Sequence, residues 1–339
     1  MKTGVTSIGI KLPVIREGDN LEDIILGELD LDILEDNDIL GITESAVARS
    51  QGNYVTVNEI ATEIKKVMNN PETITIVNCI YSRNRFAMIL KAIARAASKR
   101  VRVYMPTYDE VGNICHGHPF TGVDYRKYYK EIIEAENKVA VIFPWEYTFD
   151  MRDTNTIYCG LHDYNSVKRG FPNMFALTDF FSDKCKYGLL GCNKSTEEKV
   201  KLFPNTAQAL ELCKSIKEKI KSITGKNIIV CVYGDGCFKD PVGGIWEFAD
   251  PVTMPAYTDA NLLQSSPNEI KLKAIIDEGK TDEEIAEIIE NKADNLTGDM
   301  LSQGTTPRKY RDLLASLMDL TSGSGDRGTP VVLIKNYFN

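Results

Sequence analysis

An aspartate between two glycines is the first arrangement in this chain that can do chemistry. Asp235 follows the apolar run 227–233 and stands between Gly234 and Gly236. A carboxylate at the end of a strand, flanked by glycines, can approach a metal ion or a phosphate closely. The same residues also suit a tight turn with a solvated aspartate, so the pattern alone leaves both interpretations open.

A second aspartate closes a loop that also holds a cysteine and two histidines. Asp124 lies shortly after Cys115, His116 and His118. One interpretation is a site for a hard cation through Asp124. Another is zinc held by Cys115, His116 and His118, although this spacing matches no standard zinc module. A loop of ordinary polar residues is the third interpretation.

A loop of small residues near the C-terminus can bind an anion. Consecutive small residues let backbone N–H groups form a nest for phosphate, and Arg327 adds a fixed positive charge. A loop of this composition is also a common flexible link, and no Walker sequence follows it. The loop consists of Ser322, Gly323, Ser324, Gly325, Asp326, Arg327 and Gly328.

A fourth candidate follows the apolar run 38–43. Glu44 and Ser45 come directly after this predicted strand, and Arg49 lies one turn of helix further on. A short helix opening here would leave free backbone N–H groups for a phosphate. An ordinary strand-to-helix turn is the alternative.

The elements that must position these groups follow from the spacing of apolar residues. Thr56 with Glu59, and Thr281 with Glu284, have the spacing of capping boxes at helix starts. The run 148–204 shows no clear period and is interpreted as an irregular insertion. Because helices and strands mix without regular alternation, the pattern favours the α+β fold class over a doubly wound sheet. The sequence predicts helices at 20–31, 56–68, 84–97, 205–223, 267–294 and 308–320, and strands at 1–13, 38–43, 73–80, 101–105, 139–143, 227–233 and 330–334.

Composition narrows the class of protein. The 339 residues carry a net charge of -8, which disfavours sequence-blind binding to nucleic acid. No apolar run approaches the roughly 20 residues that span a bilayer, and residues 1–10 lack the layout of a signal peptide. We therefore expect a cytoplasmic protein with no membrane partner. The 8 cysteines form no C-x-x-C pair, which favours buried reduced thiols.

The order of these pieces is similar to that of a known family. The chain contains, in this order, Lys11-Leu12-Pro13, Gly18-Asp19-Asn20-Leu21, the strand Asp38–Thr43, Arg49 with Gly52, Gly112-Asn113-Ile114-Cys115, Gly122-Val123-Asp124, Thr224-Gly225-Lys226 before the strand that leads to Asp235, and the C-terminal helix, glycine-rich loop and closing strand. This order resembles that of the coenzyme F420:L-glutamate (gamma-glutamyl) ligases. The likeness extends over most of the chain, and the order of the motifs is a stronger signal than any one of them.

The resemblance implies a two-domain fold in an intertwined homodimer. Residues 1–70 with 205–339 would form the core that binds nucleotide and metal, and 71–204 a second α/β domain. The implied reaction adds L-glutamate, or a similar amine, to a small-molecule carboxylate acceptor through an acyl phosphate, driven by GTP or ATP.

The resemblance also implies roles for individual residues. Asp124 and Asp235 would bind Mg²⁺ or Mn²⁺ and, with Arg49, would form the catalytic set. The nucleotide contacts implied are Leu12, Pro13, Glu44, Ser45, Arg49, Lys127, Ser322, Gly323, Ser324, Gly325, Asp326, Arg327 and Gly328.

The chain departs from the family pattern at several of these positions. Arg49 stands where the family has a lysine, and Lys127 where it has an asparagine. Where the family has an Asp-Thr pair, this chain has Asp235-Gly236. The family also has an acidic or amide metal ligand near the glycine-rich loop, and Asp319 is the candidate counterpart here. A branch with a different acceptor is therefore expected.

Two other function classes remain open at this point. A strand followed by Gly-Asp-Gly, with Asn261 further on, also resembles the motif that holds Mg²⁺ on thiamine diphosphate. The glycine that follows Asp235 also fits a nucleotide-binding protein that kept the fold and lost catalysis.

Overall fold

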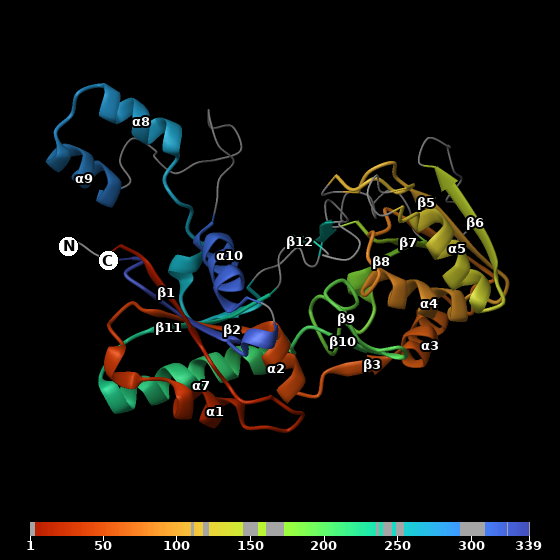
Figure 1. The fold of residues 1–339 in the computed structure, drawn as a ribbon, viewed down its shortest axis with the longest axis horizontal. Coiled ribbons are helices and arrows are strands. Elements are labelled where there is room, and N and C mark those ends of the chain that lie inside the picture. The colour runs from red at the N-terminus through yellow and green to blue at the C-terminus, as the bar shows by residue number, and fades with distance from the viewer. Residues whose placement is uncertain are drawn as a thin grey trace.

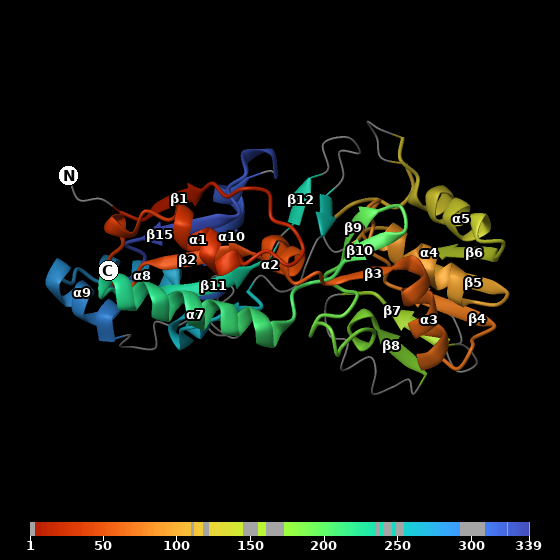
Figure 2. The ribbon, with the colours of Figure 1, turned by 90° about the horizontal axis from the view of Figure 1, so that it is seen from below.

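The structure is a computed structural model of a mixed α/β protein with several sheets (Figures 1 and 2). It describes residues 4–109, 112–117, 122–144, 155–160, 173–234, 237–239, 246–248, 254–291, 309–323 and 325–338. No helix among these residues is both long and apolar enough to cross a membrane.

One sheet combines the two ends of the chain with two strands from its interior. Its order is β1-β15-β2-β11-β14. Strands β2 and β11 run parallel, and the other neighbours are antiparallel. The strands are β1 (Thr6–Ile10), β2 (Ile39–Thr43), β11 (Ile229–Tyr233), β14 (Ala256–Tyr257) and β15 (Val331–Lys335).

Both faces of this sheet are covered, which explains why β11 is buried along its whole length. Alternate residues of a strand point to opposite faces. Leu40 and Ile42 therefore join one apolar cluster with α1 (Leu21–Glu28) and α7 (Thr206–Thr224), whereas Ile39 joins another with α10 (Tyr310–Ser322). Gly41 permits the close approach of α10, because a Cβ there would lie 2.2 Å from Met318 Sδ.

A second sheet is entirely parallel and has the order β6-β5-β4-β7-β8. Its strands are β4 (Thr73–Val77), β5 (Arg100–Met105), β6 (Val139–Pro144), β7 (Asn155–Tyr158) and β8 (Met174–Ala176). Helices α4 (Phe86–Ala96) and α5 (Tyr125–Ala135) are the crossovers from β4 to β5 and from β5 to β6, and α4 packs between α5 and α3 (Val57–Val67). We call this part of the molecule the parallel-sheet region.

Three features of this region differ from the sequence interpretation. The alternation β4-α4-β5-α5-β6 is regular, although the sequence favoured a fold without such alternation. The described parts of 148–204 supply β7 and β8 to the sheet and are not an irregular insertion. Helix α3, grouped above with 1–70, packs in the apolar cluster of the parallel-sheet region. Strands of three or four residues are too short to show a period in the sequence.

A small antiparallel sheet lies where the chain enters and leaves the parallel-sheet region. Strand β3 (Tyr54–Thr56) pairs with β10 (Lys199–Lys201), which pairs with β9 (Asn193–Thr196). In Figure 1 this sheet lies between the two larger ones. The hairpin β9–β10 therefore contacts both halves of the molecule.

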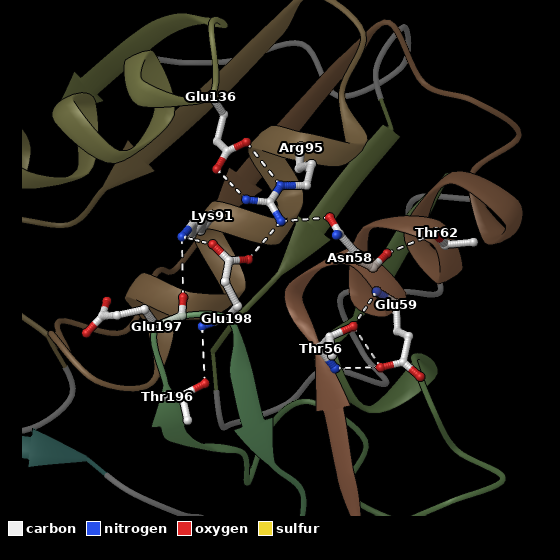
Figure 3. Close-up of polar contacts among 10 residues, drawn as sticks. All are labelled: Thr56, Asn58, Glu59, Thr62, Lys91, Arg95, Glu136, Thr196, Glu197 and Glu198. Atoms are coloured by element: carbon white, nitrogen blue, oxygen red, sulfur yellow. Dashed lines mark hydrogen bonds and ion pairs between the residues drawn. The ribbon is translucent and has the colours of Figure 1, made fainter.

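Polar side chains fix this hairpin on α4 (Figure 3). Arg95 donates to Glu136, to Glu198 and to Asn58, and Lys91 forms an ion pair of 2.5 Å with Glu198. These side chains come from α3, α4, the end of α5 and the β9–β10 turn. The predicted capping box at the start of α3 is present in the same view: Glu59 Oε2 accepts from the Thr56 amide at 2.7 Å.

The remaining elements are shorter. They are α2 (Glu44–Ser50), β12 (Cys237–Lys239), β13 (Trp246–Phe248), α8 (Glu269–Asp277), α9 (Asp282–Asn291) and the 3-10 turns Leu31–Ile33, Leu177–Asp179, Ala260–Leu263 and Gly325–Arg327. The second predicted capping box is present at α9, where Thr281 and Glu284 exchange hydrogen bonds. Gly225 ends α7 with a φ of 74°, as its position in the sequence predicts. The 7 cysteines whose side chains the structure describes are buried and free.

Candidate functional site

The first candidate site is a pocket of about 390 Å³ beside the parallel pair β2–β11. We call it the glycine-loop pocket. It lies where β2 ends, because Thr43 pairs with Tyr233 at the last position of both strands. Its walls come from three separate parts of the sequence. They are Leu12, Pro13, Val14, Ile15, Thr43, Ser45, Ala46, Arg49, Asp319, Ser322, Gly323, Gly325, Gly328, Thr329 and Pro330.

Backbone hydrogen bonds hold the three parts together. The amide of Leu12 donates to the carbonyl of Gly328 at 2.9 Å, and the amide of Thr43 donates to the carbonyl of Pro330 at 2.8 Å. The Thr329 hydroxyl donates to the carbonyl of Ser322 at 2.7 Å, which closes the glycine loop on itself. These hydrogen bonds fix the positions of the three wall segments relative to one another.

Two glycines give the loop its path. Gly323 ends α10 with a φ of 64°, and Gly328 has a φ of 66° before the chain enters β15. Residues with a Cβ rarely adopt this left-handed conformation. The Gly323 amide and the Ser322 hydroxyl both bond the carbonyl of Asp319, so the last turn of α10 is fixed at the pocket wall.

Positive charge in the pocket comes from Arg49. Its side chain is exposed at the end of α2, and it is the only lysine or arginine among the described lining residues. Arg327 is exposed beside Gly323 and does not line the pocket. A guanidinium and a loop of small residues in the same pocket suit a phosphate or another anion.

Glu44 has a different environment from the one that the sequence suggested. Its carboxylate is buried and accepts two hydrogen bonds from Lys201 Nζ, at 2.8 and 2.7 Å. Its neighbours Thr43 and Ser45 line the pocket, whereas Glu44 itself does not. The side chain therefore joins α2 to strand β10 and is not positioned as a direct nucleotide contact. No local pattern could identify Lys201 as its partner, because 157 residues separate the two.

Asp124 is the N-cap of α5 in the parallel-sheet region. Its Oδ1 accepts from the amides of Arg126 at 2.9 Å and Lys127 at 3.3 Å. Helix α5 lies far from α2 and α10, the helices that contribute residues to the glycine-loop pocket (Figures 1 and 2). Lys127 is exposed on α5, where its Nζ lies 4.0 Å from Glu131 Oε1. Lys127 does not line the glycine-loop pocket either. Within one chain, these two residues do not join the nucleotide contacts that the resemblance implied.

Other predicted residues lie outside the described part of the chain. Asp235, Gly236, Ser324 and His118 are among them, and so is the side chain of Asp326. Tyr233, the last residue of β11, pairs with Thr43 of the pocket wall. Asn261, the partner in the thiamine diphosphate interpretation, accepts from Gln264 at 2.9 Å in a 3-10 turn.

The described residues do not form a complete cation site. No group of three or more His, Cys, Asp or Glu side chains within them could hold a metal ion. Cys115 is buried and 3.5 Å from His116, which leaves the zinc interpretation with two described candidates. Asp319 is the one acidic residue among the described lining residues of the glycine-loop pocket.

The comparison with known families agrees with the order of motifs in the chain. The F420-0:Gamma-glutamyl ligase family matches residues 9–336. The chain belongs to this family. Its members are gamma-glutamyl ligases, which form a carbon–nitrogen bond, and membership supports a glutamate ligase role for this chain. Among curated proteins, none matches the sequence.

The matched residues include both large sheets, so the family model covers the parallel-sheet region as well as the sheet beside the glycine-loop pocket. The glycine-loop pocket gathers eight of the residues assigned to nucleotide binding from the sequence. They are Leu12, Pro13, Ser45, Arg49, Ser322, Gly323, Gly325 and Gly328.

Proposed function

We propose that the chain is a nucleotide-dependent amide ligase that joins L-glutamate, or a similar amine, to a carboxylate acceptor. The observation that carries the proposal is the glycine-loop pocket, which brings Arg49 and the loop 322–328 to the end of β2 in a member of a gamma-glutamyl ligase family. GTP or ATP would place its phosphates in this pocket, with Leu12 and Pro13 along one wall.

The chemistry that the proposal requires is phosphoryl transfer followed by amide formation. A carboxylate oxygen of the acceptor attacks the γ-phosphorus, and the nucleoside diphosphate leaves. The amine then attacks the acyl carbon of the acyl phosphate, phosphate leaves, and the amine gives up a proton. Charge neutralisation and positioning supply most of the rate in phosphoryl transfer. Arg49 and the backbone amides of the loop would serve that purpose here.

A divalent cation, Mg²⁺ or Mn²⁺, belongs to the proposal as the counter-charge bound with the triphosphate. Asp319 on the pocket wall and Asp235 after β11 are the carboxylates of this chain that would hold it near the phosphates. Asp124 would reach such a cation only from a second protomer, since in its own chain it caps α5. The homodimer is therefore proposed together with the metal role of Asp124.

Nucleotide binding tests the proposal before any acceptor is known. We expect GTP or ATP with Mn²⁺ or Mg²⁺ to raise the Tm of the protein, and Arg49→Ala to remove most of that shift. Lys65→Ala is the matched control, because Lys65 is an exposed cation on α3 in the parallel-sheet region. A shift with thiamine diphosphate and none with either triphosphate would overturn the proposal.

Product formation tests the ligase step itself. With nucleotide and glutamate present, candidate carboxylates should yield a glutamyl adduct by mass spectrometry, together with nucleoside diphosphate and phosphate. Nucleotide binding without product across a broad acceptor panel would instead identify a binding protein that has lost catalysis.

A further inference from the structure

A second pocket lies at the carboxyl edge of the parallel sheet, where the strand order reverses at β4. We call it the switch-point pocket. Its volume is about 160 Å³, and its described lining residues are 78–80 after β4, Pro106, Tyr108 and Asp109 after β5, and Gly160 after β7. The turn after β4 continues to Asn84, whose carbonyl accepts from the amide of Lys194 in β9 at 3.2 Å. The hairpin β9–β10 therefore contacts the turn that supplies one wall of this pocket.

The same hairpin reaches the wall of the glycine-loop pocket through Lys201. Its ammonium donates to both oxygens of Glu44, the first residue of α2, and both side chains are buried. The residues on either side of Glu44, Thr43 and Ser45, line the pocket. A charge-assisted contact inside a protein is stronger than the same contact in water. Lys201 therefore fixes the start of α2 beside the pocket wall.

Helix α2 depends on tertiary contacts for its position, because it is short. It has 7 residues, and a helix of this length is not stable on its own. Within the described residues its N-cap, Thr43, forms no side-chain cap hydrogen bond. The far end is held by the amide of Gly18, which donates to the carbonyl of Ser50 at 2.9 Å. The pair of Glu44 with Lys201 supplies a side-chain anchor for the first turn.

The position of α2 matters because it carries Arg49. This residue lies in the last turn of the helix and lines the glycine-loop pocket. A helix of about two turns moves as one body, so a shift of its first turn also moves the guanidinium. Hydrogen bonds to phosphate oxygens require donor–acceptor distances of about 2.7–3.2 Å, so a small displacement breaks them.

We propose that Lys201 is a positioning residue for nucleotide binding: through Glu44 it fixes α2 so that Arg49 reaches the phosphates. Lys201 itself does not line the pocket and acts through its partner. This role rests on the nucleotide site proposed above. It makes the hairpin β9–β10, and with it the parallel-sheet region, part of the support of that site.

Charge is the competing explanation for any effect of Lys201 on the nucleotide. The pair with Glu44 carries no net charge, whereas a carboxylate that loses its ammonium partner beside the pocket would repel a triphosphate. Positioning and repulsion make different predictions for a variant in which both charges are removed. Repulsion then disappears, whereas the link between α2 and β10 remains broken.

Titration calorimetry of the full chain with GTP and with ATP, each with Mg²⁺, tests this role. For the triphosphate that binds the wild type, we expect Lys201→Met to raise the Kd about ten- to a hundredfold, the usual result of losing a contact to a charged group. Lys201→Arg keeps two donors for the carboxylate and should stay within about threefold of the wild type. Lys194→Met is the matched control, because it removes the same charge from an exposed position in the same hairpin, and it should leave the Kd unchanged.

The double variant Glu44→Gln/Lys201→Met separates positioning from charge and stability. No buried charge loses its partner in it, so it should recover most of the Tm that Lys201→Met loses. We expect its Kd to remain raised about tenfold or more, because the link is still absent. This variant carries the test if Lys201→Met does not fold. Recovery of the wild-type Kd together with the Tm would overturn the positioning role.

Arg49 supplies a second test, because Lys201 is proposed to act through it. In an Arg49→Ala background, Lys201→Met should raise the Kd by less than about threefold, since two residues that share one contact are not additive. The full effect of Lys201→Met in that background would show that it acts elsewhere.

The outcomes also separate this role from the proposed function. A wild-type chain that binds neither triphosphate overturns both. A wild-type chain that binds one of them, with Lys201→Met binding equally well, overturns the role of Lys201 alone and leaves the ligase proposal standing.

Discussion

The two pockets occupy the same kind of place in two different sheets. Each lies where parallel strands end: the glycine-loop pocket at β2 and β11, the switch-point pocket at β4, β5 and β7. Their charged residues differ. Arg49, Asp319 and a loop of small residues line the first, whereas Asp109 is the one charged residue among the described lining residues of the second. Strand topology sets where a ligand can bind, and a few loop residues set which charge it carries.

Two ion pairs of different burial connect the parallel-sheet region to the rest of the molecule. The hairpin β9–β10 joins them, with Lys201 buried against Glu44 at one end and Glu198 exposed near Arg95 at the other. The first ion pair has side chains only 7% and 1% exposed. A buried pair and an exposed pair on the same hairpin predict very different effects of mutation.

Breaking the buried pair should give the largest effect. Lys201→Met leaves the Glu44 carboxylate buried without its ammonium partner, and we expect a loss of about 3–5 kcal/mol in the free energy of unfolding. Urea unfolding measures it. Lys99→Met is the control, because Lys99 and Glu72 form a pair 3.0 Å apart with side chains 60% and 68% exposed. Equal losses in the two variants would contradict the role given to Lys201.

Substitution of Arg49 should impair the function proposed for the glycine-loop pocket. If this residue faces the transferring phosphate, Arg49→Ala should lower kcat/KM for the nucleotide by about 100-fold, the usual result of losing one such contact. Arg49→Lys, which keeps the charge and loses the planar fork, should fall between the variant and the wild type. Wild-type kinetics in Arg49→Ala would remove this residue from the phosphate site.

Asp124 tests whether a helix cap also binds a cation. Asp124→Ala should destabilise the protein by about 1 kcal/mol, whereas Asp124→Asn should be nearly neutral, because asparagine caps helices as well as aspartate does. Thermal unfolding checks both values. Asparagine is a weaker ligand for a hard cation, so full ligase activity in Asp124→Asn would contradict the metal role.

The sequence predicted those parts of the molecule whose signals are local. The long apolar run of β11, the period of α7 and the capping box at Thr56 and Glu59 all depend on neighbouring residues, and the structure contains each of them. The pocket walls at Leu12, Arg49 and the glycine loop could be grouped only through the order of family motifs. No physical pattern in the sequence places them together.

Interactions between distant residues were not predictable in the same way. The carboxylate of Glu44 looked available because its partner Lys201 is far away in the chain. For Asp124 a local signal existed: Tyr125, Tyr129 and Ile133 have helical spacing and are buried, so the aspartate before them was a candidate N-cap. Predicting the switch-point pocket requires the strand order of the parallel sheet. That order is hard to predict, because strands as short as β7 and β8 show no clear period in the sequence.

The exposed pair on the hairpin should give the smallest effect, and acid should reveal it. Hydrogen bonds from Arg95, then from Lys91, lower the pKa of Glu198 from its ordinary 4.5 to about 2. The stabilisation from this carboxylate is therefore complete above pH 4.5 and lost as the pH falls towards 2. Because its side chain is 53% exposed, solvent screening limits the contribution to about 0.2–1 kcal/mol. The difference in unfolding free energy between wild type and Glu198→Gln should shrink between pH 4.5 and 2; a constant difference across that range would mean that the charge of Glu198 does not anchor the hairpin on α4.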